Sequence, residues 1–578
     1  MRKSNNIAAG SALLPTNAGE MRARGWDAVD VILVTGDAYV DHPAFGVALI
    51  GRLLEAEGFR VAVLSQPRHD SPAAFTEFGP PRLFWGITAG NLDSIVANYS
   101  GNAKVRDTDQ YSPGGNPYFG EIRAKLERRR PDRATIRYAN LARSAYGHVP
   151  IILGGLEASL RRFVHYDYQQ EGLRASVLTD AKADLLIYGM GERAVVEAAQ
   201  RLAAGQDLRG IDGTCIRLTE AQMADIPGRE DHVVLPSLEE IRQDMGSFLA
   251  AELLIDKHAR ALGRAMLVQK QQAMWVAQYP PAAPLVTAEL DRLYGLGFTR
   301  RPHPAAGDVP AYRMISHSIT IVRGCFGNCS FCAISRHQGP VVTSRSAESI
   351  LAEAGRVAAM ADFRGTISDL GGPTANLYGS SCTSSGCKRH DCLAEGVCRH
   401  LSMDEARFID LLDRVKGVSG VKNVFVSSGL RMELLLKTPR LLKKLLVDHT
   451  PGAMKIAPEH TVAHVLKLMH KQKPDILPAF LDLCRKIGGE AGRKFMFTPY
   501  FISAHPGCTL ADMRALAGDV RKMGLAVRQF QDFTPTPGTI STAMYVAGLD
   551  REHRRPLFVA RKAGERLAQR QVLEEMKK

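Results

Sequence analysis

Cysteine is absent from the first 214 residues of this 578-residue chain, although the whole chain contains ten cysteines. No apolar run is long enough to cross a bilayer, so we predict no membrane partner. The basic start is followed by a short, interrupted apolar stretch, which does not predict a signal peptide. We therefore expect a cytoplasmic protein in a reducing compartment, where clustered cysteines more often bind metal or do redox chemistry than form disulfides.

Acidic residues are too few to balance the basic ones, because Asp plus Glu number 60 and Lys plus Arg number 74. The basic stretches at residues 125–133 and 551–578 also contain acidic residues, which is typical of solvated helix faces. The excess could attract RNA or another anionic partner. No aromatic-interleaved nucleic-acid motif accompanies it, so an RNA substrate stays open.

The chain is too long for one typical domain, and its N-terminal part alternates strand and helix patterns. Short apolar runs that end in Gly, Ser or Thr predict buried strands. These runs are residues 30–35, 60–65, 82–87, 149–155 and 183–189. Strands separated by helices predict a mostly parallel sheet covered on both faces. We predict a doubly wound, Rossmann-like domain over residues 1–230, with a ligand crevice at the carboxyl ends of its strands.

The second half of the chain shows a further series of strand patterns. A connecting segment is predicted first, over residues 231–310, helical to about residue 278 and then rich in proline and glycine. Six apolar runs separated by helical patterns follow, and they predict an incomplete, TIM-like (β/α)6 barrel over residues 311–545. A basic helical tail is predicted for residues 546–578. The predicted fold class is α/β in both domains.

Three cysteines, Cys325, Cys329 and Cys332, stand after the first barrel strand in the segment ITIVRGCFGNCSFCAI. A structural zinc site takes four protein ligands, and a disulfide would pair two thiols and leave one over. An iron–sulfur cluster normally takes four thiolates, so three leave one iron without a protein ligand. An open coordination position is where a metal centre does chemistry. We therefore predict a [4Fe–4S] cluster with one reactive iron.

This loop resembles that of the radical S-adenosylmethionine (SAM) superfamily. The resemblance implies that the open iron binds SAM and that one electron cleaves it to a 5′-deoxyadenosyl radical, which abstracts hydrogen from a substrate. It also implies a one-electron reductant, such as flavodoxin or ferredoxin, as partner. More narrowly, the whole chain resembles the YgiQ family of radical SAM proteins. The shared segments include GDAYVDHPAFG, GGLEASLRRFVHYDY, DLGGPTANLYG, APEHT and DFTPTPGTISTAMY. The substrate and product stay open.

The resemblance also implies SAM-binding residues at the ends of later strands. Gly371 and Gly372 stand where the superfamily holds the methionine amine through backbone carbonyls. Arg345 and Arg431 are candidates for binding the SAM carboxylate. Lys455 and Glu459 are candidates for binding the ribose. No catalytic residue is assigned beyond the cluster ligands.

Four more cysteines fall within seventeen residues, in an insertion over residues 380–400 that follows the second barrel strand. They are Cys382, Cys387, Cys392 and Cys398. Four thiols separated by Gly, Ser and Asp predict a metal-bound loop. A full set of four ligands suits either a closed zinc site or an auxiliary iron–sulfur cluster. The position of the insertion predicts that it lies near the three-cysteine loop.

A doubly wound domain before a radical SAM barrel resembles the cobalamin-binding architecture. The signature of that architecture, Asp-x-His-x-x-Gly, is not intact, because Asp41 and His42 are adjacent and Gly46 lies four positions after His42. The sequence therefore argues against His42 as an axial ligand and leaves cobalamin itself open.

Two other functions stay open beside SAM cleavage. The first is methylthiotransfer to RNA, which is opposed by the lack of an N-terminal cysteine triad and by a helical rather than β-barrel end. The second is a non-catalytic, zinc-stabilised and basic RNA-binding or scaffold protein. That protein would explain the charge and the four-cysteine insertion, but it leaves the three-cysteine loop unexplained.

Overall fold

The computed structural model describes residues 12–226, 232–384, 387, 391–393 and 396–577. It divides into two compact units. Unit 1 comprises Met1–Arg242, Gly263–Ala283 and Arg292–Ser316, and unit 2 comprises Gln243–Leu262, Pro284–Asp291 and His317–Lys578. Within the described residues, no helix has both the length and the apolar character needed to cross a membrane.

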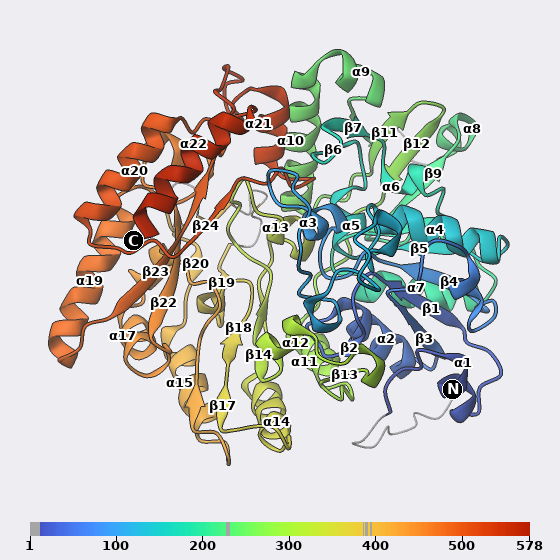
Figure 1. Ribbon diagram of the computed structural model, residues 1–578, viewed down its shortest axis with the longest axis horizontal. Helices are drawn as coiled ribbons and strands as arrows, with labels where there is room; N and C mark the ends of the chain where they lie inside the picture. The colour runs from blue at the N-terminus through green and yellow to red at the C-terminus, as the bar shows by residue number, and fades with distance from the viewer. Residues whose placement is uncertain (1–11, 227–231, 385–386, 388–390, 394–395, 578) are drawn as a thin grey trace. The chain divides into compact units, whose positions relative to one another are not determined.

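Unit 1 is built on a nine-stranded sheet with the order β10-β11-β12-β9-β8-β5-β4-β1-β3 (Figure 1). Five of its strands pair in parallel. They are β1 (Val31–Thr35), β3 (Val61–Ser65), β4 (Phe84–Ile87), β5 (Ile151–Leu153) and β8 (Leu185–Ile187). These are the five runs predicted from the sequence, and most of their side chains are buried, as strands covered on both faces require. The predicted α/β class with a large parallel sheet is confirmed.

The longest connection in this parallel sheet joins β4 to β5. It begins with α3 (Ser94–Asn98) and ends with α4 (Ala134–Ala145), which packs against both strands. Residues 99–133 between the two helices contain only short 3-10 turns and isolated bridges. On the other connections, α2 (Gly46–Ala56) packs against α7 (Glu192–Ala203). The irregular stretch at residues 99–133 is important for the carboxyl edge of the sheet, as described below.

The stretch predicted to be a connecting segment is divided between the two units. Its helix α10 (Met245–Ala261) belongs to unit 2, whereas β11 (Leu267–Gln271) and β12 (Met274–Gln278) form an antiparallel hairpin in unit 1. The helical prediction up to residue 278 is therefore wrong beyond α10. Gln272 has φ +57° in the turn between the two strands. β11 pairs antiparallel with β12, and β12 pairs in turn with β9 (Thr214–Leu218), which joins the hairpin to the sheet.

Unit 2 contains strands that pair in parallel in the order in which they follow along the chain. They are β14 (Ser318–Thr320), β17 (Thr366–Ile367) with β18 (Asp369–Gly371), β21 (Asn423–Val424), β22 (Ala453–Glu459), β23 (Met496–Ser503) and β24 (Gln529–Asp532). β14 pairs with β18, β17 with β21, β22 with β23, and β23 with β24. A parallel bridge between Leu430, which follows β21, and Ile456 of β22 connects the third strand of the series to the fourth. Six consecutive βα units of an incomplete barrel would give this order.

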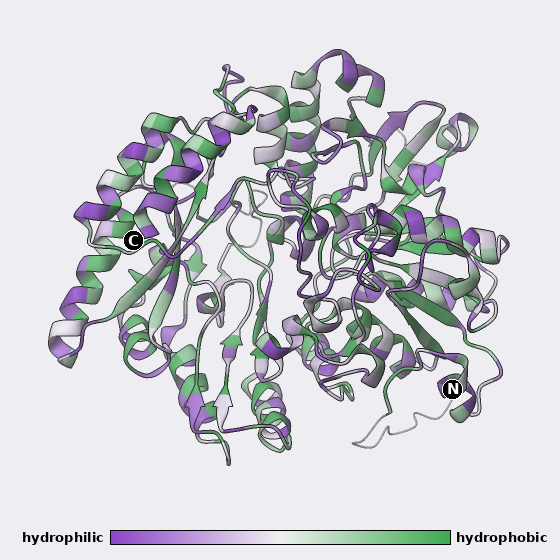
Figure 2. Ribbon diagram, in the orientation of Figure 1, coloured by the Kyte–Doolittle hydropathy of each residue, from purple (hydrophilic) through white to green (hydrophobic). Residues whose placement is uncertain are grey.

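Helices cover the strands of unit 2 in sequence order. They are α14 (Ala347–Ala358), α15 (Glu405–Lys416), α17 (Pro439–Asp448), α19 (Ile476–Ala491) and α20 (Leu510–Lys522), and the first four contact one another in turn. In α17 the buried residues Leu441, Leu442, Leu445 and Leu446 form one apolar stripe. Figure 2 shows the same division on the outer helices, which carry hydrophobic and hydrophilic faces. The predicted helical tail contains α22 (Ala563–Glu574), which packs on α20.

Candidate functional site

The three-cysteine loop lies between β15 (Val322–Arg323) and α13 (Ile334–Gln338), so it has the strand–loop–helix setting that the sequence predicts. Gly324 has φ +81°, and a Cβ there would overlap the carbonyl of Val341, so only glycine fits. Cys325 and Cys329 are buried, Cys332 is partly exposed, and none of the three thiols forms a disulfide. The loop thus presents three free sulfurs at the end of the first strand of unit 2.

The three thiols influence one another and receive backbone donors. Burial, and then the thiols of Cys329 and Cys325, raise the pKa of Cys332 to about 12. The N–H of Gly327 donates to Cys325 Sγ at 3.3 Å, and the N–H of Ile334 donates to Cys332 Sγ at 3.4 Å. Thiolates this close repel one another, and bound iron cations would offset that repulsion. Backbone N–H donors to sulfur are also typical of iron–sulfur sites.

Ser330, between the second and third cysteines, ties the loop to other segments of unit 2. Its N–H donates to the carbonyl of Met469 at 2.9 Å, and its own carbonyl accepts from the N–H of Ser541 at 2.8 Å. Its hydroxyl accepts from Nη1 of Arg551 at 2.9 Å. These hydrogen bonds position the backbone of the loop without using any thiol, so the sulfurs are held in place by the surrounding fold.

Phe331 continues this support on the other side of Ser330. Its ring packs edge-on against His505, with centroids 6.4 Å apart and an interplanar angle of 87°. Nδ1 of His505 donates to the carbonyl of Pro506 at 2.9 Å, and Nε2 accepts from the hydroxyl of Ser541 at 2.7 Å. Burial lowers the pKa of His505 to about 3. At neutral pH the ring is therefore uncharged, and its edge-on packing against Phe331 supports the loop.

Arg431, which follows the third strand, reaches the sulfurs of the loop. Its Nη2 lies 3.2 Å from Cys329 Sγ and 4.0 Å from Cys325 Sγ, and its Nη1 donates to Glu433 at 2.7 Å. Asn376 binds the main chain of Arg431, accepting from its N–H at 3.1 Å and donating to its carbonyl at 3.0 Å. The sequence suggested a SAM-carboxylate role for Arg431, but its partners in the structure are cysteine sulfurs and a glutamate.

Gly371 and Gly372, at the end of β18, are both closely packed. A Cβ on Gly372 would lie 2.6 Å from the carbonyl oxygen of Val322, and one on Gly371 would lie 2.5 Å from a carboxylate oxygen of Asp369. The carbonyl of Gly371 already accepts from the N–H of Ile321 at 2.8 Å. Glycine is thus required for space at position 372, where a Cβ would meet backbone, whereas at position 371 it would meet side-chain oxygens of Ser428 and Asp369.

Arg345 is fully buried in the core of unit 2. Its Nη1 donates to the carbonyl of Thr320 at 2.8 Å and to the carboxylate of Glu353 at 2.5 Å, and its Nη2 donates to the hydroxyl of Ser349 at 2.7 Å. These contacts hold α14 against β14. We therefore do not retain Arg345 as a residue for the SAM carboxylate.

Glu459 ends β22 in a strained conformation, with φ +66°, where the pairing with β23 shifts register. Its carboxylate is buried, and within the described residues its Oε2 has no hydrogen-bond partner. Oε1 lies 3.9 Å from Nζ of Lys471, and burial raises the pKa of Glu459. Backbone strain and a buried polar atom at the end of a barrel strand are typical of residues that contact a ligand. Lys455, the other ribose candidate, is exposed on the same strand.

All four cysteines of the 380–400 insertion belong to the described residues, although parts of the insertion lie outside them. Cys392 is buried in the hydrophobic core of unit 2. Burial, and then the thiols of Cys398, Cys382 and Cys387, raise the pKa of Cys392 to about 12. The four thiols are free of disulfides and lie near enough to act on one another. Among the described residues, no three His, Cys, Asp or Glu side chains form a ready single-ion site.

Asp391 connects the insertion to the cysteine loop. Its two carboxylate oxygens lie 3.1 and 2.9 Å from Nε2 of His470. The preceding residue, Met469, accepts the hydrogen bond from the N–H of Ser330 described above. The two cysteine sets are therefore joined by a short path of hydrogen bonds within unit 2. Sequence analysis missed His470 and Ser330, because nothing in their local pattern distinguishes them from ordinary loop residues.

Two family models match the chain, "Radical SAM N-terminal" over residues 13–318 and "Radical SAM superfamily" over residues 319–520. The chain belongs to the radical SAM superfamily. A UPF0313 protein of Geobacter sulfurreducens is 45% identical over 97% of this chain and 92% of its own length. A UPF0313 protein of Methanocella arvoryzae is 44% identical over 96% and 92%. This radical SAM enzyme is thus a member of the UPF0313 proteins, and its superfamily implies a [4Fe–4S] cluster and SAM as cofactors.

A solved structure has the same fold as this radical SAM enzyme. It is the radical S-adenosylmethionine methyltransferase TsrM from Kitasatospora setae, with tryptophan substrate and the SAM analogue aza-SAM bound. The TM-score is 0.52 at 14% identity, and the alignment covers 94% of this chain and 89% of that chain. At this identity the likeness shows the fold alone.

The crevice of unit 1 in this radical SAM enzyme is filled by the chain itself. The order β3-β1-β4-β5 places the switch point of the sheet, where such folds bind ligands, between β1 and β4. There Arg130 donates from Nη2 to Asp37 at 2.5 Å and from Nε to the carbonyl of Ala89 at 3.2 Å, and its Nη1 lies 3.0 Å from Asp109. Arg130 comes from residues 99–133, and only 1% of its side chain is exposed.

The histidine near this crevice has an internal role as well. His42 is buried, and its Nδ1 accepts from the N–H of Ala44 at 3.1 Å, so the ring caps its own turn. Asp41 is paired with Arg52 at 2.6 Å. The residues present do not fit cobalamin at the switch point, because buried ion pairs occupy it and His42 faces its own backbone.

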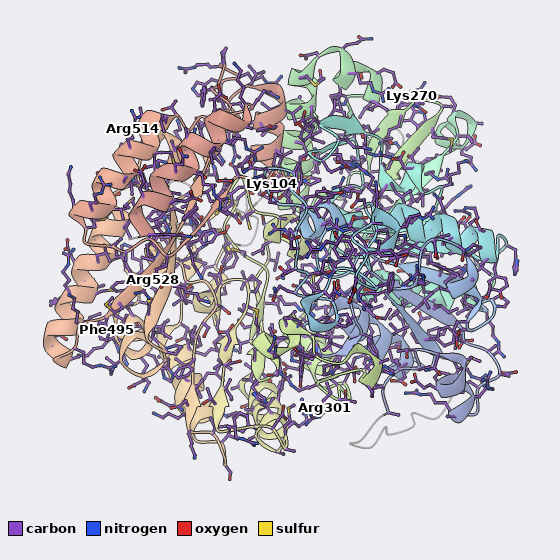
Figure 3. All side chains as sticks on the ribbon, viewed as in Figure 1. Lys104, Lys270, Arg301, Phe495, Arg514 and Arg528 are labelled. Atoms are coloured by element: carbon purple, nitrogen blue, oxygen red, sulfur yellow. The ribbon has the colours of Figure 1, made fainter. Side chains whose placement is uncertain are left out.

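One of the two basic stretches, residues 125–133, differs from the solvated faces that the sequence favours. In residues 125–133, Arg128 and Arg130 are buried, because they pair with acidic residues of unit 1 rather than face solvent. In the tail, Arg570 pairs with Glu574 and Asp532, but its side chain is 41% exposed, as on a solvated helix face. Exposed basic residues do occur elsewhere, including Arg514 and Arg528 of unit 2 (Figure 3).

Proposed function

We propose that this radical SAM enzyme binds a [4Fe–4S] cluster through Cys325, Cys329 and Cys332 and reductively cleaves SAM to a 5′-deoxyadenosyl radical for hydrogen abstraction. The observation that carries the proposal is the loop of three mutually close, free thiols at the end of a barrel strand. When bound, the cluster supplies one electron to SAM, and a reductant such as flavodoxin or ferredoxin restores it. The chain's own residues orient SAM and exclude water.

The SAM contacts that the structure supports best are Glu459 and the glycines that end β18. Glu459 offers a buried carboxylate oxygen to a hydroxyl donor, which suits the ribose. Gly371 and Gly372 stay candidates for the methionine amine because they lie at the end of β18, against the strand that leads into the cysteine loop. We keep the exposed Lys455 as a further candidate for the ribose.

The test is SAM turnover by anaerobically reconstituted enzyme supplied with dithionite. We expect methionine and 5′-deoxyadenosine to form, and Cys329→Ala to abolish both. The matched control is Cys484→Ala, because Cys484 is also a buried cysteine of unit 2 but belongs to neither cysteine set. Cleavage that persists in Cys329→Ala would show that the cluster is assigned to the wrong residues.

We also propose that Cys382, Cys387, Cys392 and Cys398 bind a second metal centre, either zinc or an auxiliary iron–sulfur cluster. The support is the closeness of four free thiols around the buried Cys392. Elemental analysis decides between the two. One zinc per chain would indicate a zinc site, whereas more than four irons and four sulfides per chain would indicate an auxiliary iron–sulfur cluster. Cys392→Ser should remove this metal and leave four irons, whereas a metal content unchanged from the parent enzyme would refute the site.

The narrower resemblance to the YgiQ family supports SAM cleavage and leaves the substrate and product open. Methylthiotransfer to RNA is the second candidate, and the structure supplies an observation against it. After β24, the described residues form helices α21 (Ile540–Ala547) and α22 and a short 3-10 turn, and no β-barrel. Membership of the radical SAM superfamily also argues against a non-catalytic scaffold.

A further inference from the structure

Arg431 is anchored both at its main chain and at one nitrogen of its guanidinium. Its main chain is held on both sides by Asn376, and its Nη1 is held by Glu433 at 2.7 Å. The side chains of Arg431 and Glu433 are only 12% and 6% exposed. What remains is Nη2, which points to Cys329 Sγ at 3.2 Å and lies 4.0 Å from Cys325 Sγ. The geometry is that of a charged donor to a cysteine sulfur.

Gly327 makes room for this contact. A Cβ at position 327 would lie within 2.5 Å of Cζ of Arg431, so any other residue would collide with the guanidinium. Gly327 does not adopt a positive φ, so its lack of a side chain is required for space and not for the turn. Gly327 therefore leaves open the space that the guanidinium of Arg431 occupies.

The arrangement differs from a site for a carboxylate ligand. An arginine that recognises a carboxylate does so best with two parallel N–H groups. Here Nη1 donates to Glu433 and Nη2 donates to Cys329. The two terminal nitrogens therefore bind two different groups of the chain and do not form a parallel pair for one carboxylate. A buried positive charge that donates to a cysteine ligand favours the more negative, reduced state of a cluster, and hydrogen bonds to sulfur are a known control of cluster potential.

We propose that Arg431 is a positioning residue that donates to the sulfur of Cys329 and thereby sets the potential at which the cluster accepts its electron. The inference rests on the proposed function. The step is the transfer of one electron from a low-potential donor to the oxidised [4Fe–4S]2+ cluster, which gives [4Fe–4S]+. No bond is made or broken, and the added negative charge is stabilised by the guanidinium.

The experiment is a redox titration of the reconstituted enzyme, with the reduced cluster followed by electron paramagnetic resonance. Arg431→Met and Gly327→Ala should both shift the midpoint potential to more negative values, since the first removes the donor and the second displaces it. Arg431→Lys keeps the charge but loses the planar fork, so a smaller shift is expected. Arg440→Met, which changes an arginine that is 73% exposed on the same unit, should give no shift.

Two further measurements keep the outcomes separate. Iron is counted in each variant, and if Arg431→Met fails to hold four irons, the midpoint shift is read from Arg431→Lys and Gly327→Ala. SAM affinity is measured by equilibrium dialysis with labelled SAM. A midpoint unchanged in these variants, together with weaker SAM binding, would assign Arg431 to the SAM carboxylate and overturn the inference. Absence of any cluster in the parent enzyme would instead refute the proposed function.

Discussion

Arg130 and Asp37 form a buried ion pair, with Nη2 of the arginine 2.5 Å from Oδ1 of the aspartate, at the switch point of the sheet of unit 1. Ninety-three positions separate the two residues along the chain. The pair joins the irregular stretch at residues 99–133 to the carboxyl end of β1, and the hydrogen bond from Arg130 to Ala89 joins it to that of β4. An ion pair therefore occupies the position where this type of fold elsewhere receives its ligand.

Removing the arginine from this pair should destabilise the enzyme. Arg130→Met leaves the carboxylates of Asp37 and Asp109 buried without their cation, a change that costs about 3–5 kcal/mol. We expect a lower thermal midpoint by calorimetry and faster proteolysis within residues 99–133. Arg123→Met is the matched control, because Arg123 lies in the same stretch but pairs with Asp107 at the surface, where both are more than two-thirds exposed. Equal midpoints for the two variants would contradict a locking role for Arg130.

The filled crevice also predicts that the enzyme does not take up cobalamin. Anaerobically prepared protein is mixed with excess hydroxocobalamin, passed through gel filtration and analysed for cobalt. We expect no cobalt in the protein fraction and no change in the corrin absorbance during titration. One cobalt per chain would show that the ion pairs of Arg130 open for a ligand, and this exclusion would then be wrong.

Asp37 gives the stability of unit 1 a pH dependence. Burial raises the pKa of Asp37 from 3.8 to about 6, although Arg130 opposes the shift. Because the folded state holds this proton more tightly than the unfolded state, stability should fall as pH rises from about 4 to 6. Asp37→Asn cannot titrate, so the difference in thermal midpoint between the parent and this variant should change over that interval. A difference that stays constant between pH 4 and 6 would exclude the effect.

Glu459 should contribute to SAM affinity through its buried carboxylate. Glu459→Gln keeps the size of the side chain but removes the charge, and a hydrogen bond to a charged group contributes about 1.5–3 kcal/mol. We expect the dissociation constant for SAM, measured by equilibrium dialysis, to rise about tenfold or more with the iron content unchanged. Glu490→Gln is the control, since Glu490 is 47% exposed on the same unit. Equal SAM affinity in both variants would remove Glu459 from the site.

Several features of this enzyme could be predicted because neighbouring residues encode them. Short apolar runs predict the five parallel strands of unit 1, since a strand buried on both faces needs consecutive apolar side chains. The hairpin of β11 and β12 was missed, because its apolar residues also fit a helical period and its turn, at Gln272, contains neither glycine nor proline. Local pattern alone does not separate these two cases.

The sequence by itself determined the α/β class and the loop of Cys325, Cys329 and Cys332, because strand periodicity and ligand spacing are written in adjacent positions. Only the tertiary structure decided which side chains meet these elements from afar. Arg431 reaches Cys329 across 102 positions, and Asp391 reaches His470 across 79. Such contacts depend on how parallel strands are ordered and where their ends converge, which no local run of residues specifies.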